Sequence, residues 1–149
     1  MKSQIQFLVI FLALALVGCS GGSESSSGPS PAGAAAGTPK VEIAFLNHSP
    51  VLMALTDVDT LLASYGDKVT VTRYDLETDQ GAQFAKSRRL TGHVPIAIFV
   101  NGSMEIKLKD RSVKFFSFPQ GKGTFMVASG SWTVEDLRQA IDQSLNRTK

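Results

Sequence analysis

The chain of 149 residues contains one cysteine, Cys19, and charge of either sign is sparse. A single cysteine forms no intramolecular disulfide and no thiol pair, so dithiol oxidoreductase chemistry is excluded and stability must come from packing. The 15 basic and 13 acidic residues leave a formal net charge of +2. This balance gives no electrostatic argument for a nucleic-acid partner. What remains is enough chain for one modest domain with its own apolar core.

The N-terminus reads MKSQIQFLVIFLALALVGCS, in which Lys2 precedes an apolar run over residues 7–17. That run is too short to span a bilayer as a helix, but it is typical of the central region of a secretory signal. It ends in Leu16-Val17-Gly18-Cys19, which resembles the lipobox of bacterial lipoproteins. The resemblance implies a signal peptide over residues 1–18 and acyl chains, such as palmitate, attached at Cys19. We therefore expect a lipid-anchored, extracytoplasmic protein on the cell membrane or outer membrane.

Residues 19–39 are predicted to be the lipidated cysteine and a flexible linker. From residue 20 to residue 39, every side chain except those of Glu24 and Thr38 belongs to Gly, Ser, Pro or Ala. Such a segment cannot bury enough apolar surface to offset the entropy lost on ordering. Twenty residues of this kind reach roughly 25 Å. The folded domain is predicted to occupy residues 40–149, just off the membrane.

The first half of the domain shows strand and helix patterns in alternation. The apolar segment Val41–Leu46 predicts a strand covered on both faces. After a break at residues 47–50, apolar residues at intervals of three and four predict a helix that ends at Gly66. Alternating β-branched residues over Val69–Tyr74 predict a second strand. An acidic turn then leads to a short helix over residues 80–89.

The second half predicts mainly strands and a final helix. Ile96–Val100 is a dense run of β-forming residues, and Asn101-Gly102 is a strong hairpin signal. Further short strands are predicted near residues 104–109, 113–118 and 124–128. Thr133 is predicted to N-cap the last helix, with Asp136 in the third position. The order β-α-β-α-β-β-α combines crossovers with hairpins, which predicts an α/β fold with a mixed sheet.

This order, with Val94-Pro95 opening a strand that ends in Asn101-Gly102, resembles the thioredoxin-like fold superfamily over about residues 41–145. The resemblance implies a three-layer α/β/α sandwich with a mixed central sheet and an extended C-terminal hairpin region. It also implies a cis bond before Pro95, beside the start of the first helix. Redox members open that helix with Cys-x-x-Cys, a place held here by His48-Ser49-Pro50-Val51. Without a thiolate there, we expect a domain that is not an enzyme.

The resemblance places a binding groove beside that proline. An extended peptide or an envelope protein could pair with the backbone edge at Val94. The leading hypothesis is therefore a membrane-anchored binding or adaptor module with no catalytic residue, resident metal, cofactor or nucleic acid. The residues implied for the groove are His48, Ser49, Pro50, His93, Val94 and Pro95.

Two other functions stay open at this stage. A copper-handling envelope protein could use His48 and His93 with a soft methionine ligand, for which Met53, Met104 and Met126 are the candidates. A structural envelope lipoprotein would need no binding site at all.

Three further expectations concern single positions and short segments. Glu42 falls where redox relatives carry a buried acid, but with no cysteine to serve it is predicted to be an exposed strand-edge residue. The acidic turn over residues 75–79 is predicted to be solvated rather than to hold Ca²⁺. The phenylalanines between the last strands are predicted to lie mainly in the core; they are Phe115, Phe116, Phe118 and Phe125.

Overall fold

The computed structural model describes residues 37–122 and 130–147. The predicted signal peptide, Cys19, most of the linker and the predicted strand over residues 124–128 lie outside the described residues, as do Phe125 and Met126. Those expectations stay predictions. Among the described residues, every helix is too short or too polar to span a bilayer.

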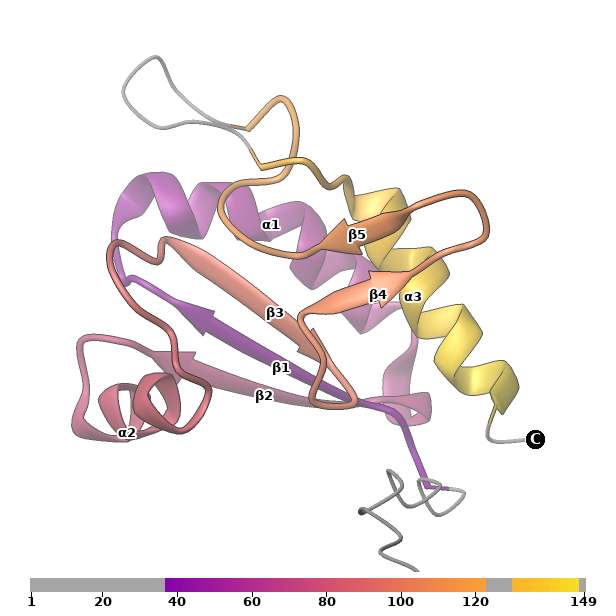
Figure 1. The fold of residues 1–149 in the computed structure, drawn as a ribbon, viewed down its shortest axis with the longest axis horizontal. Coiled ribbons are helices and arrows are strands. Elements are labelled where there is room, and N and C mark those ends of the chain that lie inside the picture. The colour runs from indigo at the N-terminus through magenta and orange to yellow at the C-terminus, as the bar shows by residue number, and fades with distance from the viewer. Residues whose placement is uncertain (1–36, 123–129, 148–149) are drawn as a thin grey trace, which may run out of the picture. The chain divides into compact units, whose positions relative to one another are not determined.

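A mixed sheet of three strands lies at the centre of the described residues (Figure 1). The strand order is β2-β1-β3, with bounds Lys40–Phe45 for β1, Thr70–Asp75 for β2 and Ile96–Val100 for β3. The central strand β1 pairs in parallel with β2 and antiparallel with β3. A helical crossover joins β1 to β2, which is the connection that a parallel pair requires. The predicted α/β class and mixed sheet are confirmed.

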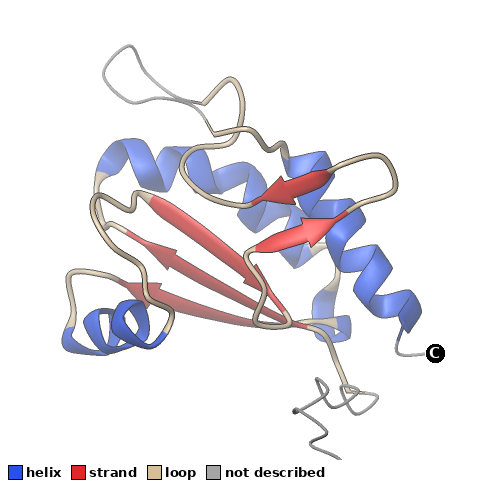
Figure 2. Cartoon of the chain, in the orientation of Figure 1, coloured by secondary structure: helices blue, strands red, loops and turns tan. Residues whose placement is uncertain are grey.

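Three helices cover the two faces of this sheet (Figure 2). They are α1 (Ser49–Ala63), α2 (Asp79–Ser87) and α3 (Val134–Arg147), and a 3-10 helix η1 (Gly66–Lys68) follows α1. Successive strand residues point to opposite faces. Ile43 and Ile98 therefore pack with α1 and α3 in one hydrophobic cluster. Ala44 and Phe99 pack with α2 in the other cluster, so the sheet lies between two helical layers.

The hairpin turn after β3 forms as predicted, but the strands beyond it are shorter than expected. Asn101 and Gly102 both have positive φ, and Val100 and Ser103 exchange two backbone hydrogen bonds across them. The bounds of the next strands are β4 Glu105–Lys107 and β5 Ser112–Lys114, and these two form a separate sheet. The chain leaves strand geometry after β5, since Ser117 has φ +65°.

Phenylalanines and a tryptophan fill the space between the hairpin and α3. Phe115 and Phe118 are fully buried, as predicted, and Phe116 is half-buried. Trp132 is also fully buried, with its ring edge-on to Phe115. Its indole N–H donates to the carbonyl oxygens of Phe116 and Ser117, so this buried polar group is satisfied. Trp132 thus fixes the entry into α3.

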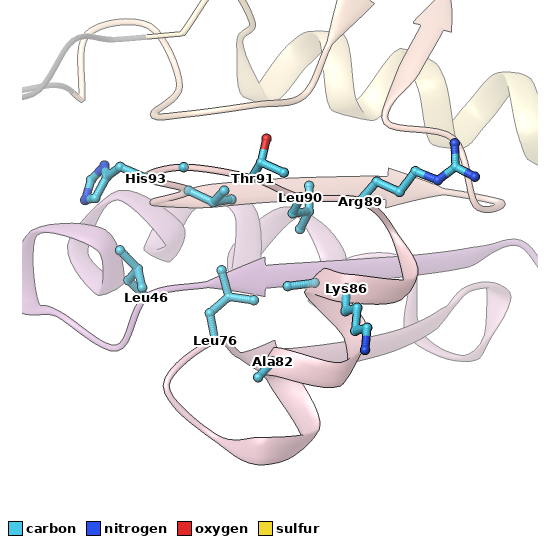
Figure 3. A pocket seen from close by; sticks show the side chains of 11 residues that line it. Leu46, Leu76, Ala82, Lys86, Arg89, Leu90, Thr91 and His93 are labelled. Atoms are coloured by element: carbon cyan, nitrogen blue, oxygen red, sulfur yellow. The ribbon is translucent and has the colours of Figure 1, made fainter.

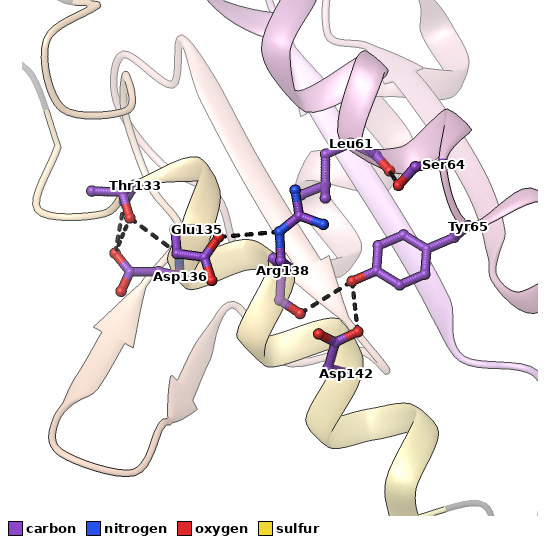
Figure 4. A network of polar contacts seen from close by, with 8 residues as sticks. All are labelled: Leu61, Ser64, Tyr65, Thr133, Glu135, Asp136, Arg138 and Asp142. Carbon is purple, nitrogen blue, oxygen red and sulfur yellow. Dashed lines mark hydrogen bonds and ion pairs between the residues drawn. The ribbon is translucent and has the colours of Figure 1, made fainter.

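The N-terminus of α3 carries the predicted capping box (Figure 4). The Thr133 hydroxyl accepts from the Asp136 N–H at 3.1 Å, and the Asp136 carboxylate accepts from the Thr133 N–H at 2.7 Å. Arg111, from the turn between β4 and β5, donates to the same carboxylate at 2.6 Å. Further along α3, the hydroxyl of Tyr65 donates to Asp142 at 2.7 Å. These contacts attach α3 to the hairpin and to the end of α1.

We expect the carboxyl group of Asp136 to make a contribution to the stability of the fold that depends on pH. Burial raises its pKa, but the hydrogen bonds from Thr133 and the Arg111 guanidinium outweigh burial, so the pKa lies below its ordinary value. Because the folded pKa is the lower one, the stabilisation is complete above the unfolded pKa of about 3.9 and is lost as pH falls through the folded pKa. We expect Asp136→Asn to lower the free energy of unfolding by about 1–3 kcal/mol at pH 7.

Urea unfolding of Asp136→Asn and the parent at neutral and acidic pH measures this contribution. The difference between the two proteins should shrink below about pH 4, because the parent then loses the same charge. Asp67→Asn, at an exposed position in η1, serves as the control and should have little effect at any pH. A difference for Asp136→Asn that does not depend on pH would contradict this account.

Candidate functional site

The first half of the predicted site is the turn between β1 and α1. His48 is the N-cap of α1 and has an extended backbone. Pro50 lies in the first turn of α1, where the backbone N–H that proline lacks would have no partner within the helix. The His48 ring does not cap the helix, because its Nε2 lies 3.1 Å from Oε1 of Glu77. Asn47 donates through its side chain to Asp75 at 3.0 Å. The acidic turn after β2 therefore holds this turn in place.

The second half is the segment that enters β3, and here one expectation is wrong. The Val94–Pro95 bond is trans, not cis. Trans is the form that an X–Pro bond prefers by about 0.5–1 kcal/mol. The Pro95 carbonyl accepts from the Leu46 N–H at 3.1 Å, so Pro95 still lies beside the end of β1. The resemblance based peptide pairing at Val94 on a cis bond before Pro95. The trans bond removes that support for peptide pairing.

A pocket of about 690 Å³ opens between α2 and the segment from Leu90 to Val94 (Figure 3). The ends of β1 and β2 contribute Leu46 and Leu76, which face this segment from below in the view. The residues that line it are Leu46, Leu76, Ala82, Ala85, Lys86, Arg89, Leu90, Thr91, Gly92, His93 and Val94.

The lining is aliphatic in its interior and basic at its edge. Six of the eleven lining residues are Leu, Ala or Val, three are Lys, Arg or His, and none is Asp, Glu, Phe, Tyr or Trp. Figure 3 shows His93 at one end of the opening and Arg89 at the other. Val94 is buried in the wall, whereas Lys86, Arg89 and His93 are exposed. The arrangement suits an apolar group that enters while a polar or anionic group stays at the rim.

The turn that ends α2 shapes this pocket. Arg89 has φ +54°, the Arg89 N–H donates to the Lys86 carbonyl at 3.2 Å, and the Leu90 N–H donates to the Ala85 carbonyl at 2.9 Å. This is the Schellman pattern of helix termination, in which a left-handed residue reverses the chain. Leu90 is thereby folded back over Ala85. Glycine is usual at the left-handed position of this motif. Because arginine stands there in this chain, the sequence did not indicate the turn.

The expectation for Glu42 is also wrong, because this residue is only 3% exposed. Its carboxylate contacts the Arg88 guanidinium and lies 2.8 Å from Nζ of Lys40. The guanidinium also lies over the rings of Phe84 and Phe99, at 5.4 and 5.1 Å. The physical reason is that β1 is the central strand, so the face that carries Glu42 is covered by α2. Since Arg88 is the C-cap of α2, this ion pair fixes the end of α2 beside the pocket.

The structure thus divides the predicted site residues into two groups. His93 and Val94 line the pocket, and the other four, His48, Ser49, Pro50 and Pro95, do not. Sequence reasoning missed the contribution of α2 and of the strand ends. The only available signal was the pair of alanines at positions 82 and 85, whose small side chains leave space on one side of a helix.

The described residues contain no cluster of His, Cys, Asp or Glu ligands around the two histidines of the copper hypothesis. Across residues 37–122 and 130–147 there is no group of three or more His, Cys, Asp or Glu side chains that could hold a metal ion. Met53 is 73% exposed on α1, and Met104 packs against the cluster on the α2 face. The side chains of Asp75 and Glu77, in the acidic turn, contact Asn47 and His48 instead.

Comparisons with known proteins identify no family for this chain. A scan against protein-family models and searches of the curated proteins and of the solved structures each find no match. The function must therefore be argued from the pocket and its surroundings.

Proposed function

We propose that the chain is a membrane-anchored extracytoplasmic lipoprotein whose thioredoxin-like domain binds a partner without catalysing a reaction. The observation that carries the proposal is the open pocket of about 690 Å³ between α2 and the segment Leu90–Val94. Its volume falls within the range of roughly 300–1,000 Å³ that is usual for ligand sites. Two of the residues predicted for the binding groove, His93 and Val94, line it.

The pairing of strands supports the thioredoxin-like part of the proposal. The resemblance implies a mixed central sheet, and the parallel β1–β2 pair with the antiparallel β1–β3 pair agrees with it. The placement of α2 opposite α1 and α3 agrees as well. Two features depart from it, which are the trans bond before Pro95 and the separate two-stranded sheet that β4 and β5 form. The proposed binding site therefore depends on the pocket and not on the proline.

The chemistry of the pocket favours binding over catalysis. Its interior side chains, such as Leu46, Leu76 and Leu90, offer apolar surface and no proton donor or nucleophile. Removing an aliphatic side chain of a partner from water contributes about 1.5–3 kcal/mol. A partner that inserts one apolar group would thus gain affinity, and the basic edge would select a polar or anionic group next to it.

Photo-crosslinking in intact cells tests this binding. We expect the full chain with a photoreactive residue at the exposed rim position Thr91 to form an adduct that mass spectrometry detects. The same residue at Thr56, exposed on α1 and outside the pocket, is the control position.

A pocket-filling variant decides whether the adduct depends on the site. Ala82→Phe places a large ring at an exposed lining position and should abolish the adduct, whereas Ala63→Phe, at an exposed position of α1, should leave it unchanged. An adduct at Thr91 no stronger than at Thr56, or one that survives Ala82→Phe, would refute binding in the pocket.

The anchoring part of the proposal has its own test. Metabolic labelling with radioactive palmitate should label the parent chain and not Cys19→Ser, because Cys19 is the only thiol available for acyl attachment. Ser20→Ala, next to the same residue, should remain labelled. Label in the Cys19→Ser chain, or none in the parent, would contradict lipidation at Cys19.

A further inference from the structure

We infer that the ligand of this pocket is an aliphatic carboxylate, an anion with a hydrocarbon body and a single acidic head. The inference rests on the proposed function and names the class of ligand for the same pocket. It follows from three features of the lining, which are its charge, the shape of its side chains and the state of the backbone groups nearby.

The charges of the lining are all of one sign. Lys86 and Arg89 are formally positive and no lining residue is acidic. Among the described residues, neither Lys86 nor Arg89 takes part in an ion pair, whereas Arg73, Arg88 and Arg111 each contact a carboxylate. The charges at the pocket edge are therefore available to a ligand. The planar fork of Arg89 matches a carboxylate, which it can bind through two parallel hydrogen bonds.

The interior suits a hydrocarbon body. The apolar lining consists of leucine, alanine and valine side chains, and the imidazole of His93 lies at one end of the opening rather than among them. Thr91 supplies the one lining hydroxyl, and Figure 3 shows it pointing away from Leu46 and Leu76. A flexible aliphatic chain can fill such a surface while its head stays at the opening, near the exposed cations.

The end of α2 opposes an anion less than a helix C-terminus with all its last carbonyl groups free would. The carbonyl groups at a helix C-terminus carry a partial negative charge. Here the carbonyl groups of Ala85 and Lys86 are bonded to the N–H groups of Leu90 and Arg89. The turn thus occupies two of the terminal carbonyl groups that would repel a carboxylate and places the charged Arg89 next to them.

Calorimetric titration with decanoate, below its micelle concentration, tests the ligand class. Both hydrophobic clusters lie within residues 41–145, so a chain of residues 20–149 keeps the whole core and dispenses with the predicted signal. Decanol and decyltrimethylammonium have the same hydrocarbon chain with a neutral and a cationic head. We expect decanoate to bind about ten-fold or more tightly than either, which corresponds to about 1.4 kcal/mol.

Variants that remove one positive charge test whether the cations at the rim bind the carboxylate. Arg89→Gly removes the guanidinium but suits the left-handed backbone at φ +54°, so the turn should survive. Lys86→Gln removes the amine, and Lys68→Gln in η1 is its control outside the pocket. We expect Arg89→Gly and Lys86→Gln each to weaken decanoate about three- to ten-fold, with Lys68→Gln and decanol binding unaffected.

The outcomes separate this inference from the binding proposal. If all three probes bind equally, Arg89→Gly changes nothing and Ala82→Phe still blocks binding, the carboxylate class is wrong and the pocket remains a binding site. If no probe binds but the Thr91 adduct forms and depends on Ala82, the ligand is of another class, such as a peptide, and the inference is overturned. If decanoate binding survives Ala82→Phe, it occurs elsewhere and the inference is likewise overturned.

Discussion

Replacing Gly81 with alanine should destabilise the domain by more than about 3 kcal/mol, the largest effect we expect of any small substitution. Gly81 lies buried in the first turn of α2, and a Cβ atom there would overlap the carbonyl group of Asp75 at the end of β2. The overlapping atoms belong to backbone, so no side chain can rotate away. The Thr78 hydroxyl accepts from the Gly81 N–H at 3.1 Å, which fixes the helix start at this distance. Relief therefore requires α2 to move.

Denaturant unfolding measures the loss of stability in Gly81→Ala, and photo-crosslinking at Thr91 measures its effect on the pocket. Because α2 supplies Ala82, Ala85 and Lys86, its displacement should also abolish the Thr91 adduct. Ala82→Gly, at the next and exposed position, is the matched control and should cost only about 1 kcal/mol, the ordinary penalty of glycine in a helix. A Gly81→Ala protein as stable as the parent would show that α2 does not approach β2 this closely.

Replacing Arg88 with methionine should cost about 3–5 kcal/mol, because the substitution leaves the Glu42 carboxylate buried with only the half-exposed Lys40 as partner. Arg88 also donates to the Gly102 carbonyl at 3.4 Å and lies over two aromatic rings. Methionine has an unbranched apolar side chain that retains contact with those rings while removing the charge. The loss should therefore report mainly the unpaired acid.

A double variant separates the unpaired charge from lost packing. Glu42→Leu combined with Arg88→Met removes both partners, and we expect it to recover most of the stability lost in Arg88→Met alone. Arg138→Met, whose ion pair with Glu135 is exposed on α3, is the matched control and should cost less than about 1 kcal/mol. A double variant no more stable than the single one would show that Arg88 acts through its contacts with Phe84 and Phe99.

The sequence by itself determined the elements whose signals are local. Hairpin chemistry at Asn101-Gly102 and the capping box at Thr133 and Asp136 depend on residues a few positions apart, and both formed as predicted. The β-forming run Ile96–Val100 became β3 with the same bounds. The α/β class followed from the order of such elements, because a helical crossover requires a parallel pair.

Only the tertiary structure decided which residues share a site and which acid is buried. The covering of Glu42 depends on β1 being the central strand and on α2 lying across it, and neither is visible in the six residues of β1. The pocket brings Leu46 and Leu76 from two strand ends against Leu90, which is folded back by the left-handed Arg89. Local sequence specifies backbone preferences within a few residues. Contacts between segments 14 to 44 positions apart depend on how those elements pack, and this is why the pocket could not be predicted from spacing.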